Sequence, residues 1–173
     1  MNKEIIFIGG IQGVGKGTLC KRIASDLNII HLSASEVLKW SDFNADSSDK
    51  KVADICATQD RLLMNLEKLI QPNKTYLLDG HFCLLNKGGE IEKVPDEVFV
   101  GINPKKIVIV CESPETICER LFQRDGKNYD VFRLEQMQII EREHAQHIAE
   151  LLRIPMYEIR SSSSDELKKI IND

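Results

Sequence analysis

Short apolar runs alternate with longer amphipathic stretches along this chain. Residues 5–8 are β-branched and aromatic without a polar break, which is typical of a strand buried on both faces of a parallel sheet. Glycines follow at once, and the next stretch carries Leu19, Ile23 and Leu27 at helical spacing. The same alternation of buried strand and amphipathic helix returns several times downstream.

This alternation predicts an α/β fold. Strands are expected at residues 5–8, 29–32, 75–78, 106–110 and 156–159, and helices at 16–27, 33–40, 52–70, 114–123, 131–152 and 164–172. We also expect a mobile polar loop at 41–50, a hairpin at 84–98 and a short loop at 125–130. Strands that alternate with helices imply about five parallel strands with helices on both faces, here in one domain over residues 1–173.

Composition narrows the class of protein. The chain has 173 residues, 42% hydrophobic and 29% charged, with a net charge of −4, so we expect no global attraction for nucleic acid or an anionic membrane. Its five cysteines are odd in number and form no CxxC pair, which favours a reduced, cytoplasmic setting over a disulfide framework. We expect no signal peptide and no membrane span. The sequence assigns no oligomeric state.

The sharpest motif is Gly-Ile-Gln-Gly-Val-Gly-Lys-Gly-Thr at residues 10–18. It follows a predicted strand and opens a predicted helix, which is the context of a phosphate-binding P-loop. Glycines let backbone N–H groups point into one concavity, and the helix N-terminus adds positive potential. Lys16 supplies a charge for the β- and γ-phosphates of ATP. Because Gly17 stands where a Ser or Thr usually follows the lysine, direct metal ligation by Thr18 stays open.

The Gly-Lys-Gly-Thr ending resembles the adenylate kinases and the other nucleoside monophosphate kinases, and further segments extend the likeness. Residues 33–39 resemble the segment that receives the acceptor nucleotide, and Asp79-Gly80 matches an Asp-Gly after the third strand. The Asp79-Gly80-His81 triplet, Asn103-Pro104 and Gln138–Arg142 resemble the archaeal type of adenylate kinase. His81-Phe82-Cys83, Lys39 and Ala34 depart from residues that the family carries near the acceptor.

The resemblance implies a three-layer P-loop NTPase fold and ATP-dependent phosphoryl transfer to a nucleoside monophosphate, with AMP as first choice and Mg²⁺ as cofactor. The acceptor-binding region would be about 33–72 and the lid about 125–130. The implied catalytic residues are Lys16, Arg120, Arg124 and Arg142, with Arg120 also stacking on adenine. The implied ATP-binding residues are Gly13, Val14, Gly15, Lys16, Gly17 and Thr18, the acceptor-binding residues are Ser33, Lys39, Arg61 and His81, and Asp79 supports the metal through water.

Plainer interpretations stand beside these roles. Asp79 could simply terminate a strand, and Arg120 and Arg124 could form a solvated basic face paired with nearby glutamates. We expect His144 and His147 to lie on a solvated face rather than bind metal, since no third ligand is evident. Cys83 and Cys111 are expected to be inert core thiols.

Two alternative functions remain open. One is a kinase for another small-molecule hydroxyl, which would need a base such as Asp79 or His81 near the acceptor. The other is a P-loop ATPase that acts as a switch for a protein partner. Basic residues on the acceptor side, Lys39 and Arg61, favour a phosphorylated small-molecule acceptor over a switch.

Overall fold

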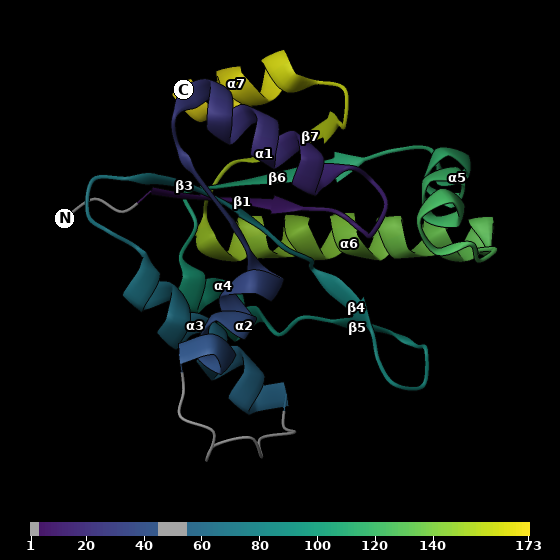
Figure 1. Ribbon diagram of the computed structural model, residues 1–173, viewed down its shortest axis with the longest axis horizontal. Coiled ribbons are helices and arrows are strands. Elements are labelled where there is room, and N and C mark those ends of the chain that lie inside the picture. Colours follow the sequence, from purple (N-terminus) through teal and green to yellow (C-terminus); the bar gives the residue numbers. More distant parts are fainter. Residues whose placement is uncertain (1–3, 45–54) are drawn as a thin grey trace.

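The computed structural model describes residues 4–44 and 55–173 of the chain. Figure 1 shows the strands of the main sheet in one layer between two layers of helices, with a separate two-stranded hairpin outside that layer. In chain order the elements are β1 (Glu4–Gly9), α1 (Lys16–Leu27), β2 (Ile30–Ser33), α2 (Ala34–Asn44), α3 (Ile55–Leu69), β3 (Thr75–Asp79), β4 (Cys83–Leu85), β5 (Ile91–Lys93), α4 (Asp96–Ile102), β6 (Lys106–Cys111), α5 (Pro114–Asp125), α6 (Val131–Leu152), β7 (Met156–Arg160) and α7 (Ser164–Asn172).

Within the described residues, five strands form one parallel sheet in the order β2-β3-β1-β6-β7. β1 is central: Ile8 lies opposite Asp79 of β3, and Gly9 lies opposite Ile109 of β6. The predicted three-layer P-loop NTPase fold is confirmed. Because all strands run the same way, the loops after β1, β2 and β3 meet at one edge, where ligands bind in open α/β sheets.

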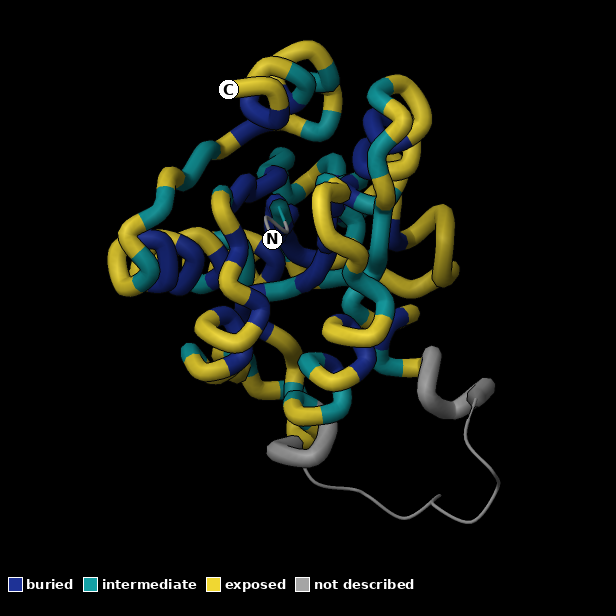
Figure 2. The backbone as a smooth tube through the Cα atoms, turned by 90° about the vertical axis from the view of Figure 1, so that its left-hand side faces the viewer, coloured by how far each residue is buried: buried dark blue, intermediate teal, exposed yellow. Residues whose placement is uncertain are grey.

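The apolar side chains of the strands divide between the two faces of the sheet. Ile6 and Ile8 pack on one face with residues of α1, α5 and α7, whereas Ile5 and Phe7 pack on the other with residues of α2, α3, α4 and α6. Figure 2 shows buried backbone in the middle of the molecule and exposed backbone on the outer sides of the helices. This explains the unbroken apolar runs, because alternate residues of each central strand face different helical layers.

The expected hairpin is shorter than predicted. β4 and β5 pair antiparallel from Cys83 opposite Lys93 to Leu85 opposite Ile91, and the chain then forms helix α4, which the sequence analysis missed. The hairpin prediction over 84–98 is therefore wrong beyond residue 93. In α4, Val98, Phe99 and Ile102 lie on one face and are buried. Seven residues give too short a window for this helical period to stand out.

The region before β3 also differs from expectation. Helix α2 continues to Asn44, so residues 41–44 are helical where a loop was predicted. The predicted loop residues 45–50, and residues 52–54 of the predicted helix, lie outside the described residues. In the described part of the chain, no helix is both long and apolar enough to cross a membrane.

Candidate active site

The P-loop connects the end of β1 to the start of α1. Gly10, Gly13 and Gly15 have φ values of 146°, 86° and 91°, which L side chains rarely adopt. A Cβ at Gly13 would also lie 2.9 Å from Cγ of Leu121, so α5 leaves no space there for a side chain. Because α1 begins at Lys16, directly after the loop, its free N–H groups and positive end lie beside the loop. This arrangement favours binding of an anion such as phosphate.

Lys16 is the cation of this loop. Its side chain is buried, with 8% of the residue exposed. Burial lowers the pKa of the Lys16 ammonium, and the nearby carboxylates of Asp79 and Glu141 raise it in part. These two carboxylates are the local counter-charges of a lysine that would otherwise be costly to bury.

Glu141 on α6 accepts hydrogen bonds from the backbone of the P-loop and of the segment after β3. Its Oε1 accepts hydrogen bonds from the N–H groups of Gly10 at 2.9 Å and Phe82 at 2.8 Å, and its Oε2 accepts one from the N–H of Cys83 at 2.7 Å. The residue is 1% exposed. Burial raises the pKa of this carboxyl, and the three backbone donors lower it in part. One side chain thus ties α6 to both the P-loop and the segment after β3.

Glu141 received no role from the sequence, where it falls inside the Gln138–Arg142 segment. A signal was present. Leu134, Glu141, Ala145 and Ile148 recur at helical spacing and are all buried, so a carboxylate interrupts an apolar stripe. A charged residue in such a position is rarely buried without partners.

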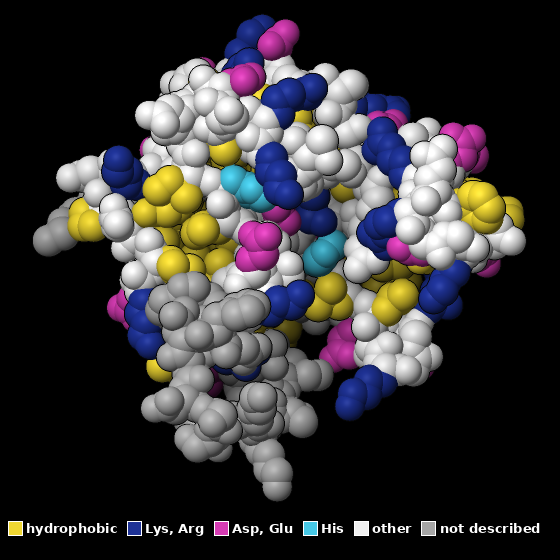
Figure 3. All heavy atoms as spheres, viewed as in Figure 1, with side chains coloured by type: hydrophobic (Ala, Val, Ile, Leu, Met, Phe, Trp, Pro, Cys, Tyr) yellow, Lys and Arg dark blue, Asp and Glu magenta, His cyan; other side chains and the backbone are white. Residues whose placement is uncertain are grey.

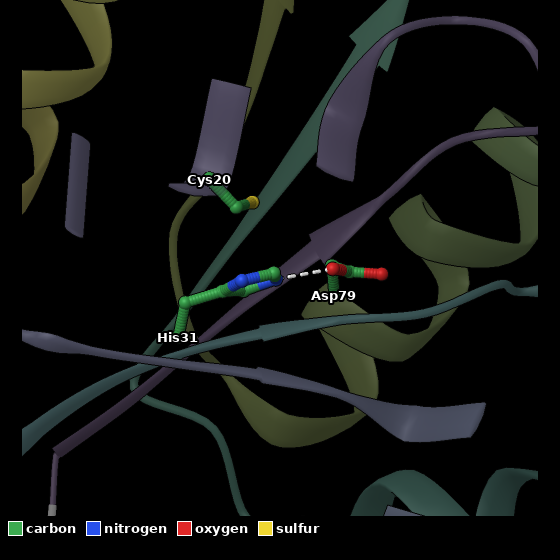
Figure 4. A group of neighbouring side chains, drawn as sticks. All are labelled: Cys20, His31 and Asp79. Atoms are coloured by element: carbon green, nitrogen blue, oxygen red, sulfur yellow. Dashed lines mark hydrogen bonds and ion pairs between the residues drawn. The ribbon is translucent and has the colours of Figure 1, made fainter. Parts of the chain in front are cut away.

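Asp79 ends β3 and is almost buried, at 9% exposure. Its Oδ2 contacts Nε2 of His31, which lies on the neighbouring strand β2. The thiol of Cys20, on α1, lies near this pair (Figure 4). Asp79 is therefore more than a turn residue, because its carboxylate joins two strands beside Lys16.

His81 lies against the P-loop. Its Nδ1 donates a hydrogen bond to the Gly10 carbonyl at 2.9 Å. Burial and, to a smaller extent, the charge of Lys16 lower the pKa of His81 to about 4. A neutral imidazole is thus expected near pH 7, whatever part it takes in binding an acceptor.

Arg120 on α5 reaches the P-loop from the other side. Its Nη1 donates to the carbonyl of Val14 at 3.0 Å and lies 3.4 Å from that of Gly13, while Nη2 donates to Oγ of Ser161 at 3.3 Å. Nη2 also lies 3.9 Å from Oε2 of Glu112, so a nearby glutamate does pair with Arg120, but this glutamate precedes α5. The guanidinium therefore links the P-loop to the segment after β7.

Two of the predicted catalytic arginines do not converge on the loop. Arg124 forms a bidentate pair with its neighbour Asp125, with both N–O distances at 2.7 Å. Arg142 pairs with Glu158 of β7 at 3.6 Å, and both side chains are about half exposed. In this conformation the structure gathers Lys16, Asp79, His81 and Arg120, and leaves Arg124 and Arg142 at a distance in surface pairs.

The predicted acceptor residues lie on β2, α2 and α3, which follow the P-loop helix. Ser33 ends β2, and its Oγ is 2.9 Å from Oγ of Ser35. Lys39 on α2 is exposed, and Arg61 on α3 is half-buried. Thr18 is exposed at the start of α1. Figure 3 shows one face of the molecule on which Lys and Arg side chains surround two histidines, with acidic side chains among them.

The prediction of a solvated histidine face is half right. His147 is exposed and pairs with Asp96 at 2.7 Å, but His144 is buried, and its Nε2 donates to the Val94 carbonyl at 2.7 Å. His144 also contacts the rings of Phe82 and Phe99 edge-on. Cys83 is buried as expected, whereas Cys111 is only partly buried. Burial raises the pKa of the Cys111 thiol to about 11 and shifts that of Cys83 upwards as well, which keeps both protonated.

Strand, glycine loop, helix and a carboxylate at the end of the neighbouring strand together define a P-loop domain. A family model described as an AAA domain matches residues 9–138. The chain belongs to this family of P-loop domains.

Adenylate kinases are among the chain's relatives. Adenylate kinase isoenzyme 1 of Homo sapiens is 28% identical over 130 residues, which cover 70% of this chain and 64% of that protein. The adenylate kinase of Prochlorococcus marinus strain MIT 9301 is 28% identical over 74% of this chain and 72% of its own length. That of strain MIT 9515 is 28% identical over 183 residues, 100% of this chain and 97% of the relative.

The matched region thus spans slightly less than two thirds of the human relative. The predicted kinship with nucleoside monophosphate kinase-like phosphotransferases is confirmed. The closer likeness to the archaeal type of adenylate kinase, and the roles of individual site residues, stay predictions.

Proposed function

We propose that this protein is an ATP-dependent phosphotransferase that moves the γ-phosphoryl group to a nucleoside monophosphate, with AMP as the first choice. The observation that carries this proposal is the buried Lys16 between a glycine loop and the carboxylate of Asp79. The relatives named adenylate kinases support the same reaction class. Phosphoryl transfer asks a protein mainly to align two phosphates and neutralise their charge, which suits a site rich in cations and backbone donors.

On the donor side, residues 13–18 would bind the phosphates of ATP. Arg120 would stack on the adenine, since it already lies along the loop from Gly13 to Val14. Arg124 and Arg142 would exchange Asp125 and Glu158 for phosphate oxygens when the lid at about 125–130 closes over the nucleotide. Their present partners lie at the surface, so both exchanges cost little.

Magnesium is the cofactor we propose for ATP. Mg²⁺ keeps several of its waters and takes few protein ligands, so one carboxylate at the edge of the sheet suits it. Asp79 fits, because Oδ1 is the oxygen not used in the contact with His31 and could accept a hydrogen bond from a metal-bound water. The exposed Thr18 is a second oxygen donor near the loop. Bound Mg²⁺ would neutralise charge on the β- and γ-phosphates.

On the acceptor side, we propose that the region at about 33–72 receives the monophosphate within a single domain. Ser33 and His81 lie at the carboxyl edge of the sheet, and Lys39 and Arg61 belong to the two helices that follow β2. Two phosphates repel each other, so an acceptor phosphate must meet cations before it approaches the γ-phosphate. Lys39 and Arg61 are our candidates for that task.

A panel of nucleoside monophosphates tests the proposal. ADP formation from ATP and Mg²⁺ is measured with each acceptor and with none, and with Lys16→Ala protein as the blank. We expect one monophosphate, AMP first, to raise ATP consumption well above the rate without acceptor. If none does, the hydroxyl-kinase or switch-ATPase hypothesis takes its place. A base such as Asp79 would then be needed for the first, and a protein partner for the second.

A further inference from the structure

Cys20, His31 and Asp79 come from three different elements and meet beside the P-loop. Sγ of Cys20, a ring nitrogen of His31 and a carboxylate oxygen of Asp79 all lie within 4.8 Å of one another. Figure 4 shows the Cys20 side chain on α1 facing the contact between His31 and Asp79. No other group of three such ligand atoms lies this close together in residues 4–44 and 55–173.

The spacing of these atoms suits a tetrahedral ion. Zinc binds sulfur at about 2.3 Å and nitrogen or oxygen at about 2.0 to 2.1 Å, so its ligand atoms in a tetrahedral site are about 3.3 to 3.6 Å apart. The three ligand atoms lie within 4.8 Å of one another, so an ion between them needs only small movements of the side chains, with the thiol moving closer and the histidine and carboxylate moving apart. Two paired strands and a helix packed on them hold the three residues, so the site is largely preformed.

The chemistry of the donors favours Zn²⁺ over Mg²⁺. Thiolate and imidazole are ligands that Zn²⁺ takes readily, whereas Mg²⁺ prefers oxygen. Binding would release the Cys20 thiol proton to solvent and use neutral His31 through Nε2, with a water completing four ligands. The side chains of His31 and Asp79 are 11% and 12% exposed, so an ion can enter from their side although Cys20 is fully buried.

Some nearby charges oppose the binding of a cation at this site, and others favour it. Lys16 interacts electrostatically with Cys20, Asp79 and Glu141, and its positive charge opposes a second cation. The carboxylate of Glu141 offsets part of this opposition. Burial raises the pKa of the Cys20 thiol to about 12, which keeps it protonated in the absence of metal, but a coordinated thiol loses its proton outright.

We propose that Cys20, His31 and Asp79 form a zinc-binding site, separate from the nucleotide-linked magnesium, and that zinc there inhibits the protein by taking Asp79 away from magnesium support. The binding part stands on the geometry alone. The inhibitory part rests on the proposed phosphotransferase function, in which Asp79 serves the magnesium bound to ATP.

Cobalt absorption tests the binding part directly, because Co²⁺ takes the place of Zn²⁺ and a cysteine ligand gives a thiolate-to-cobalt charge-transfer band. The reduced full chain is titrated with Co²⁺ and then with Zn²⁺, without nucleotide. We expect one equivalent of Co²⁺ to produce the band together with tetrahedral ligand-field bands, and Zn²⁺ to remove them. Cys20→Ala should lose the charge-transfer band, and His31→Gln, which keeps the thiol, should weaken cobalt binding at least about tenfold.

Cys118→Ala is the matched control, since Cys118 on α5 donates its thiol to the Tyr129 carbonyl, away from the cluster. It should keep both the band and the affinity. Should Cys20→Ala not fold, as judged by circular dichroism, His31→Gln alone decides the matter. A wild-type protein without the charge-transfer band, a band that survives in folded Cys20→Ala, or an unchanged cobalt affinity in His31→Gln overturns the site.

The inhibitory part is measured separately, as the effect of one equivalent of zinc on ADP formation at saturating Mg²⁺ and ATP. We expect a loss of most of the rate in wild type and a smaller loss in Cys20→Ala. Equal losses in the two proteins overturn the inhibitory part. A protein that binds cobalt through Cys20 but shows no phosphoryl transfer with any monophosphate contradicts the proposed function and leaves the zinc site standing.

Discussion

Lys16 is the residue on which the donor half of the account depends. It is buried beside the glycine loop, with Asp79 and Glu141 as counter-charges. We expect Lys16→Ala to lower turnover by about two orders of magnitude or more, as for other single donors to a developing anion. Far-UV circular dichroism should stay unchanged, because the glycines shape the loop.

Lys21→Ala is the control for this change, because Lys21 lies on the same helix and is exposed. It should keep its turnover. Near wild-type turnover in Lys16→Ala would contradict a role of the P-loop in phosphoryl transfer.

Asp79 is the second residue with a sharp expectation. Asp79→Asn keeps the size of the side chain and removes the charge. We expect turnover to fall about ten- to a hundredfold, the usual cost of losing a group that supports a metal through its waters. The Mg²⁺ concentration for half-maximal rate should rise. If the Mg²⁺ concentration for half-maximal rate is unchanged, Asp79 does not support the metal and has only a structural role in the contact with His31.

For individual residues, the sequence predicted those that belong to a contiguous motif and missed those that are defined by long-range contacts. Lys16 was predicted because a strand, a glycine loop and a helix follow each other directly, and Asp79 because it ends a predicted strand and matches the Asp-Gly of the resemblance. Glu141 reaches Gly10 across 131 positions of the chain, and its partners are backbone N–H groups that no side-chain pattern reports. Arg120 likewise reaches the backbone carbonyls of Gly13 and Val14, more than 100 positions away, so the sequence placed it near the nucleotide only through a resemblance.

Among the elements, α6 is joined to the P-loop by Glu141. Glu141→Gln can keep one oxygen for the Gly10 and Phe82 N–H groups but turns an amide NH₂ toward the Cys83 N–H. A buried donor without its acceptor costs about 1–3 kcal/mol, so we expect the free energy of unfolding to fall by that amount. Urea denaturation measures it as a lower midpoint at an unchanged slope.

Glu143→Gln, two residues further along α6, is exposed and serves as the control. Its midpoint should match wild type. Equal midpoints for Glu141→Gln and wild type would mean that the hydrogen bond from the Cys83 N–H adds nothing to stability.

Helix α3 contributes Arg61, which we expect to bind the phosphate of the acceptor. Arg61→Glu reverses the charge that we assign to the acceptor phosphate. The acceptor KM should rise about tenfold, the effect of about 1.4 kcal/mol of lost attraction, while the KM for ATP changes little. Lys74→Glu is the control, since Lys74 precedes β3 at the opposite edge of the sheet. Equal shifts in both KM values would remove Arg61 from the acceptor side.

Elements with a strong period were predictable, and short elements were not. The central strands and the long helix α6 follow from unbroken apolar runs and a sustained helical pattern. Helix α4 was missed because it has only seven residues, and the first three of them, 96–98, were assigned to the preceding hairpin. Tertiary packing of Val98, Phe99 and Ile102 against the core decides in favour of the helix.

For the whole molecule, the order of strands and helices was sufficient to predict the architecture. β1 lies between β3 and β6, so the P-loop, Asp79 and His81 converge at one edge although up to 71 positions separate them. The chemistry of the acceptor is harder to predict, since it depends on side chains from separate helices. Departures at Ala34, Lys39 and Cys83 fall in that part of the chain.

The central claim is that the γ-phosphoryl group passes to a nucleoside monophosphate, and the fate of a label on that group tests it most directly. ATP labelled in the γ-phosphoryl group is incubated with Mg²⁺, the protein and each monophosphate in turn, and the products are separated. We predict that the label enters the diphosphate formed from the acceptor, AMP first, at a rate that Lys16→Ala loses. Label found only in inorganic phosphate, whichever monophosphate is present, would contradict the account.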